Sequence, residues 1–137
     1  MFPINLAAVS VAAVAAFAIG FLLHGPVLGK LWMKLANIHP TGNEKFADML
    51  PQFFWSLVTN FVTAFVLAGI LWMSSLSMGP ISAGRAVIAA AWLWLGFLVT
   101  SSATEVIWMG RSYKLWLFEA FASLLTITAM AAIIAAW

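Results

Sequence analysis

The chain has too few charged residues to cover itself in water. Its six Lys and Arg and four Asp and Glu make 7% of 137 residues, and 65% of the chain is hydrophobic. Ordinary soluble domains have about 25% charged and roughly 45–50% apolar residues. A domain of this size exposes a large share of its residues, so it needs many polar side chains. The composition therefore excludes a soluble domain and a disordered segment.

Several kinds of functional residue are also missing or scarce. Cysteine is absent, which excludes disulfides, thiolate nucleophiles and Cys-ligated metals. The two histidines, His24 and His39, have no third ligand near them in the sequence. The chain has no Gly-rich phosphate loop and no G-x-S-x-G motif, and its six basic residues are too dispersed for a nucleic-acid footprint. We expect no enzymatic activity, no cofactor, no metal and no nucleic-acid partner.

What the chain does have is long apolar runs. Asp, Glu, Lys and Arg are absent from 1–29, 49–84, 86–104 and 120–137. A membrane-spanning helix needs about 20 mainly apolar residues, and serine, glycine and proline within 74–84 indicate a turn. We predict an all-α polytopic membrane protein, a single transmembrane domain over 1–137. Its four transmembrane helices are expected at about 4–25, 51–73, 85–107 and 115–137. The first lacks Lys or Arg ahead of it, so we expect a retained span rather than a cleaved signal peptide.

The connection between the first two spans is expected to lie on the membrane surface. Residues 27–36 place Lys30 and Lys34 one turn apart beside several leucines and Trp32, a pattern typical of a short amphipathic interfacial helix. Thr41 and Glu44 have the spacing of a capping box, which predicts a second short helix over about 42–50.

The basic residues predict an orientation. Five of the six lie in the two loops on one side of the membrane: Lys30, Lys34, Lys45, Arg111 and Lys114. Arg85 alone lies on the other side. Because short cytoplasmic loops carry excess Lys and Arg, we expect these two loops in the cytoplasm. The protein would then lie in a bacterial inner membrane with both termini outside the cytoplasm.

Small residues and tryptophans indicate packing faces. Ala8, Ala12, Ala16 and Gly20 recur every fourth residue, which predicts a face where a second helix approaches closely. Shorter repeats of the same spacing follow in the second span (Ala64, Ala68) and the fourth (Ala132, Ala136). Six of the eight Trp residues fall near predicted span ends, as an aromatic belt does. Trp92 and Trp94 lie inside the third span and face lipid, a neighbouring helix or a partner.

Four polar residues inside the spans are candidate site residues. His24, Glu105 and Glu119 lie in the predicted cytoplasmic half, and Asn60 lies somewhat deeper. Such groups are costly in a membrane and point to function. One interpretation is a single cytoplasmic-side pocket between all four helices that relays protons or binds a cation. The other is structural: Glu119 pairs with Lys114 or Arg111, Glu105 lies at the interface, and His24 caps a helix end.

The segment AIGFLLHGPVLGKLWMK at 18–34 resembles a known family. The likeness continues in AWLWLGF at 91–97, in Gly-Arg at 110–111 followed by KLW at 114–116, and in Trp137. The chain is similar to the bacterial family catalogued as domain of unknown function 1761. Leu23 and His24 stand where that family has an aromatic pair, so no role of that pair carries over. The resemblance implies four membrane helices and no catalytic residues.

Two functions fit these features. The first is an uncharacterised, non-enzymatic inner-membrane protein that binds or passes a small solute or ion through the cytoplasmic-side pocket. The second is an accessory or structural subunit of a larger membrane complex, or a homo-oligomer. The lipid bilayer is the partner common to both.

Overall fold

The computed structural model describes residues 3–137, and within them every regular element is a helix. Met1 and Phe2 of the predicted 1–137 domain lie outside the described residues. The elements are α1 (Leu6–His24), α2 (Gly29–Ala36), η1 (Phe46–Met49), α3 (Leu50–Met78), α4 (Ala83–Leu93), η2 (Trp94–Val99), α5 (Thr100–Ile107) and α6 (Tyr113–Ala136). Four rods are long and apolar enough to cross a membrane: α1, η1–α3, α4–η2–α5 and α6. The predicted all-α polytopic fold is confirmed.

The second span is longer than predicted. α3 continues through the serines at 74–77, where the sequence indicated a turn. The hydroxyls of Ser74, Ser75 and Ser77 donate to carbonyls three or four residues back on the same helix, so they do not break it. The helix ends only at Gly79, whose φ of 72° suits a residue without a Cβ.

The short helix predicted over about 42–50 is present only as the 3₁₀ turn η1 at Phe46–Met49. Residues 42–45 are not helical, and the 3₁₀ turn η1 leads directly into α3. The capping-box spacing instead closes a loop, because the Glu44 carboxylate accepts the backbone N–H groups of Thr41 (2.7 Å) and Gly42 (3.0 Å). The bond from the Thr41 N–H is the main cause that holds the pKa of Glu44 below its ordinary value.

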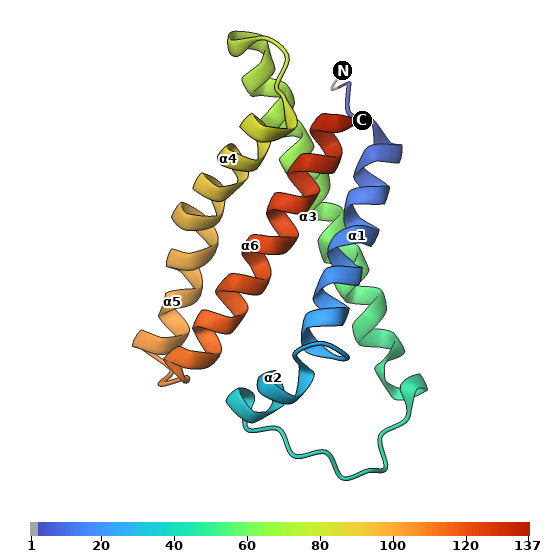
Figure 1. Cartoon of the computed structure of the whole chain (residues 1–137), viewed down its shortest axis with the longest axis vertical. Coiled ribbons are helices and arrows are strands. Elements are labelled where there is room, and N and C mark those ends of the chain that lie inside the picture. Colours follow the sequence, from blue (N-terminus) through green and yellow to red (C-terminus); the bar gives the residue numbers. More distant parts are fainter. Residues whose placement is uncertain (1–2) are drawn as a thin grey trace.

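The four rods form an open row rather than a closed ring. Figure 1 shows α6 between α1 and the α4–α5 rod, with α3 behind α1. α1 packs extensively on both α6 and α3, whereas α3 has much less contact with α6. At most 28% of the residues in any span's apolar window are buried. Most of the side-chain surface therefore faces outward, as expected for helices in lipid.

Small residues make the close contacts at the centre of this row. Ala8, Ala12 and Ala16 of α1 are at most 1% exposed, and Ala64 and Ala68 of α3 are buried in the same core. Gly20 continues the spacing but does not pack on another helix, since a Cβ there would meet no atom within 4 Å. In α6 the buried residues of the same core are Ile127, Met130 and Ala131, so the Ala132 and Ala136 spacing does not mark the buried face.

The third span contains a local widening that the sequence did not indicate. Trp94–Val99 is a π-helical segment between α4 and α5. Trp94 lies here against α6, where its indole N–H donates to the Ala120 carbonyl (2.8 Å) and the Ser123 hydroxyl (3.0 Å). Trp92 is 71% exposed and points away from the core. Trp94 therefore connects the third span to α6 by hydrogen bonds, whereas Trp92 faces outward.

A tight turn after α1 brings α2 back against α6. Gly25 permits this turn, because a Cβ at this position would lie 2.8 Å from the Phe21 carbonyl oxygen. α2 then begins at Gly29 and contacts both α1 and α6. This arrangement places the indole of Trp32 beside the end of α1 and the first turns of α6.

Candidate functional site

An ion pair joins the end of α1 to the beginning of α6. The Nε2 atom of His24, the last residue of α1, lies 3.0 Å and 3.2 Å from the two carboxylate oxygens of Glu119. The other ring nitrogen, Nδ1, lies 2.9 Å from the backbone oxygen of Gly20 in the last turn of α1. Both nitrogens of His24 are therefore engaged, and the ring orientation is fixed.

Trp32 completes the cluster from α2. Its indole N–H donates to the Glu119 carboxylate at 2.9 Å. Its ring meets the His24 ring edge-on with centroids 5.1 Å apart, and Phe118 does the same from α6 at 5.5 Å. Edge-to-face contacts at such distances are favourable. Three helices thus converge on one carboxylate.

The hydrogen-bond geometry constrains the protonation of this pair. A backbone oxygen only accepts hydrogen bonds, so Nδ1 must carry a proton. The contact between Nε2 and the carboxylate then holds one more proton, either on the imidazole or on the carboxyl group. In both forms the pair is neutral overall.

The His24 side of the cluster faces a mainly apolar pocket of about 560 Å³, here called the α1–α3 pocket. Phe17, Phe21 and Phe53 form part of its wall, with ring centroids 5.9 Å apart in the two pairs that include Phe53. The other lining residues are Ala16, Gly20, His24, Gly25, Trp32, Phe46, Met49, Ser56, Asn60 and Thr126. Because Trp32 of α2 is one of these residues, the pocket lies towards the end of the molecule that carries α2.

The Glu119 side faces a smaller, charged pocket of about 250 Å³ beside α5 and α6, here called the α5–α6 pocket. Glu105 lies in it and pairs with Arg111 at 2.5 Å. Trp116 closes part of its wall and donates its indole N–H to Ser102 at 3.0 Å. The His24–Glu119 pair therefore separates an apolar pocket from a charged one.

These positions correct the prediction of one pocket between all four helices. His24 and Asn60 line one pocket, and Glu105 and Glu119 line another. The reason is the open row of helices: α3 packs mainly on α1 and has much less contact with α6, so the polar residues of α3 and those of α5 and α6 line separate spaces.

The structural interpretation of these residues also needs correction. The side-chain bonds of Glu119 go to His24 and Trp32 rather than to Lys114 or Arg111. Arg111 bonds to Glu105 instead. The part of that interpretation that agrees with the structure is the bond of His24 to a carbonyl in the last turn of its own helix.

The role of Trp32 could not be read from the sequence. Its place among the leucines of residues 27–36 assigned it to the membrane-facing side of an interfacial helix. The turn at Gly25 directs the Trp32 side chain towards Glu119. The sequence spacing of His24, Trp32 and Glu119 does not reveal this contact. Within residues 3–137, no group of three or more His, Cys, Asp or Glu side chains lies together as a metal site would require.

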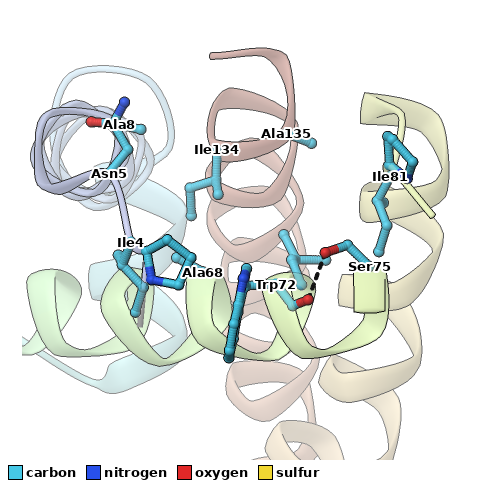
Figure 2. Close-up of a pocket in the computed structure, with 12 residues that line it drawn as sticks. Ile4, Asn5, Ala8, Ala68, Trp72, Ser75, Ile81, Ile134 and Ala135 are labelled. Carbon is cyan, nitrogen blue, oxygen red and sulfur yellow. Dashed lines mark hydrogen bonds between the residues drawn. The ribbon is translucent and has the colours of Figure 1, made fainter. Parts of the chain in front are cut away.

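A third pocket of about 470 Å³ lies at the opposite end, near both chain termini. Figure 2 shows Ile4, Trp72, Ile81 and Ile134 around it, from four different segments. The hydroxyl of Ser75 is turned away to the Trp72 carbonyl, 2.6 Å distant. The pocket has no charged side chain in its lining.

Comparison with known proteins identifies a family but no characterised relative. No curated protein matches the chain. No solved structure matches it. A family model described as protein of unknown function (DUF1761) matches residues 7–135, which include the His24–Glu119–Trp32 cluster and all of the four membrane-length rods except the first residue of α1 and the last of α6. The chain therefore belongs to the DUF1761 family of proteins of unknown function.

Proposed function

We propose that this membrane protein binds a small solute in the α1–α3 pocket and is not an enzyme. The observation that carries the proposal is the wall of that pocket, where His24 is held in one orientation by Glu119 and by the Gly20 carbonyl. Ligand pockets typically have volumes of about 300–1,000 Å³ and a mainly apolar lining with a few fixed polar groups. The α1–α3 pocket, at about 560 Å³, has this character.

The packing supports binding rather than passage. Beyond the pocket, α1 lies against its neighbours through Ala8 and Ala12, each at most 1% exposed. Backbones that approach through such small residues leave no room for a continuous path. A solute that enters beside His24 would therefore leave from the same end.

We further propose that the protein lies in a bacterial inner membrane with the α2 end in the cytoplasm. The beginning of α1 and the end of α6 lie together at the other end of the molecule (Figure 1). Five of the six basic residues lie at the α2 end, in α2, in the two loops or in the first turn of α6: Lys30, Lys34, Lys45, Arg111 and Lys114. The excess of Lys and Arg in cytoplasmic loops supports this orientation.

One observation favours association with a second protein chain as well. Trp92 lies nine residues into the third span, roughly 14 Å along the helix and near the midplane of a bilayer about 30 Å thick. It is 71% exposed, and its indole N–H has no hydrogen bond within residues 3–137. Trp prefers the membrane interface, where that N–H finds a partner. A homo-oligomer or an accessory role in a larger complex would cover this residue.

The binding proposal is tested by filling the pocket. Gly20 lines it, and a Cβ there meets no atom within 4 Å, so Gly20→Leu should occupy the pocket without disturbing the helices. Gly96→Leu is the matched control, because Gly96 also has free space but is exposed and lies outside the pocket.

The measurement is mass spectrometry of small molecules extracted from protein purified in mild detergent. We expect a compound at close to one per chain in the wild type and in the control, and at least a tenfold loss in Gly20→Leu. Equal recovery from all three, including recovery of nothing, would contradict the proposal. Chemical cross-linking in membranes separately tests oligomer formation, which Trp92→Ala should weaken.

A further inference from the structure

Two polar side chains in the lining of the α1–α3 pocket lack a hydrogen-bond partner within residues 3–137. The Asn60 amide and the Ser56 hydroxyl both line it, and neither side chain has a hydrogen-bond partner in the part of the chain that the structure describes. They are four residues apart on α3, so they project from the same side of the helix. An unpaired amide inside a membrane span is costly unless a ligand or water bonds to it.

The remaining polar groups of the lining are already engaged. His24 uses both ring nitrogens. The Trp32 N–H donates to Glu119, and the Thr126 hydroxyl donates to the Ser123 carbonyl. Hydrogen bonds to a bound molecule would therefore come mainly from Asn60 and Ser56.

The pocket also selects against charge. No Asp, Glu, Lys or Arg lines it, and the one titratable lining residue, His24, is paired with Glu119 in an arrangement that is neutral overall. An ionised ligand would enter a mainly apolar space without a counter-ion, which is strongly unfavourable. The ligand is therefore expected to be neutral.

The shape of the lining favours a flat ring. Phe53 of α3 meets Phe17 and Phe21 of α1 at steep interplanar angles, 87° and 71°, and meets Phe46 at 5.3 Å. Aromatic walls of this kind accept a further ring in stacked or edge-on contact. The two free donors, the Asn60 NH₂ and the Ser56 O–H, suit carbonyl oxygens on the edge of such a ring.

We infer that the α1–α3 pocket binds a neutral, lipid-soluble ring compound with carbonyl acceptors, the chemical class of the quinones. This inference rests on the proposed function, because it names the class of solute for the same pocket. It concerns binding alone, with Asn60 and Ser56 as the hydrogen-bond donors and the phenylalanines as the apolar wall.

The test compares a ring compound that has carbonyl groups with one that lacks them. Menadione and 2-methylnaphthalene share one carbon skeleton, and only menadione has carbonyl groups. Their binding to the whole detergent-solubilised protein is measured by equilibrium dialysis against empty micelles. We expect menadione to bind about tenfold more tightly, which corresponds to roughly one well-made hydrogen bond.

Variants separate the donors from the apolar wall. Asn60→Leu should lower menadione affinity about tenfold and leave 2-methylnaphthalene within twofold, and Ser56→Ala should act in the same direction. Thr63→Val is the matched control, because Thr63 lies on α3 outside the pocket and bonds to its own helix. Equal affinity for the two rings in the wild type, or no effect of Asn60→Leu, would overturn the quinone inference.

Failure of the inference can be told apart from failure of the proposed function. If Gly20→Leu still abolishes retention of an extracted compound while menadione shows no preference over 2-methylnaphthalene, the pocket binds a solute of another class. If Gly20→Leu leaves menadione binding and retention of every extracted compound unchanged, both ideas fail.

Discussion

Removal of the Glu119 carboxylate should reveal how strongly the cluster stabilises the fold. Glu119→Leu leaves the Nε2–H of His24 and the N–H of Trp32 without their acceptor. A fully buried orphaned donor costs about 1–3 kcal/mol. The side chains of His24 and Glu119 are 28% and 42% exposed, so solvent or headgroups partly replace the lost bonds. We therefore expect a loss near the lower limit, about 2 kcal/mol for the two donors.

A double-mutant cycle isolates the part that belongs to the pair itself. His24→Leu, Glu119→Leu and the double variant are compared with the wild type. Side-chain hydrogen bonds between membrane helices average about 0.6 kcal/mol and reach about 1.7 kcal/mol. Because this contact involves both carboxylate oxygens, we expect a coupling energy of about 1 kcal/mol. Glu119→Gln keeps one acceptor oxygen and should lose about half as much stability as Glu119→Leu.

The assay is reversible unfolding in mixed micelles, followed by circular dichroism of the helices. Single-variant losses that add to the double-variant loss within about 0.3 kcal/mol would show that the two side chains do not interact. A Glu119→Leu variant as stable as the wild type would refute the reasoning on the orphaned donors.

Three further predictions concern the packing faces and the first loop. Ala12→Leu should destabilise the protein by about 1–3 kcal/mol in the same unfolding assay, because Ala12 is fully buried between helices. Ala18→Leu is the control and should have little effect, because Ala18 lies on the exposed face of α1. Trp94→Phe should lower the free energy of unfolding by about 1 kcal/mol, because the indole N–H loses its bonds to α6. Trp92→Phe should leave the stability of the monomer nearly unchanged, because Trp92 is exposed. Equal losses in the two variants would contradict the different roles given to these tryptophans. Since the folded pKa of Glu44 lies below its unfolded value, its loop should be fully ordered at neutral pH and should loosen as the pH falls below about 4. Amide hydrogen exchange of the loop would detect this, and protection that does not change with pH would argue against the carboxylate's role.

The helices could be predicted because composition and charge spacing determine them. A charge-free run of apolar residues must form a helix in lipid, since each backbone group needs a partner within the segment. The end of α3 was misplaced because serine is ambiguous: its hydroxyl favours turns, yet it can also bond to the preceding turn of a helix, as Ser74 and Ser75 do. The Thr41–Glu44 spacing failed for a related reason, since the same side-chain bonds close a loop without starting a helix.

Of the three residues of the candidate cluster, His24 and Glu119 could be identified from the sequence, whereas Trp32 and the arrangement of the three could not. Ionisable groups inside a span are rare enough to identify His24 and Glu119 from the sequence. His24 and Glu119 are 95 residues apart in the sequence, and they pair because α1 and α6 are neighbours. The spacing of small residues does not reveal which helices are neighbours. The sequence suggested one pocket between all four helices. In the structure α3 packs on α1 and has much less contact with α6, and the four residues line two pockets.

The central claim is that the chain crosses the membrane repeatedly with the α2 end in the cytoplasm. Because the chain has no cysteine, single cysteines report its orientation without background. Ser77→Cys, near the end of α3, and Asn43→Cys, in the first loop, are treated with a membrane-impermeant maleimide in intact bacterial spheroplasts. The account predicts labelling of Ser77→Cys at once and of Asn43→Cys only after lysis. Labelling of Asn43→Cys in intact spheroplasts, or equal labelling of both, would contradict it.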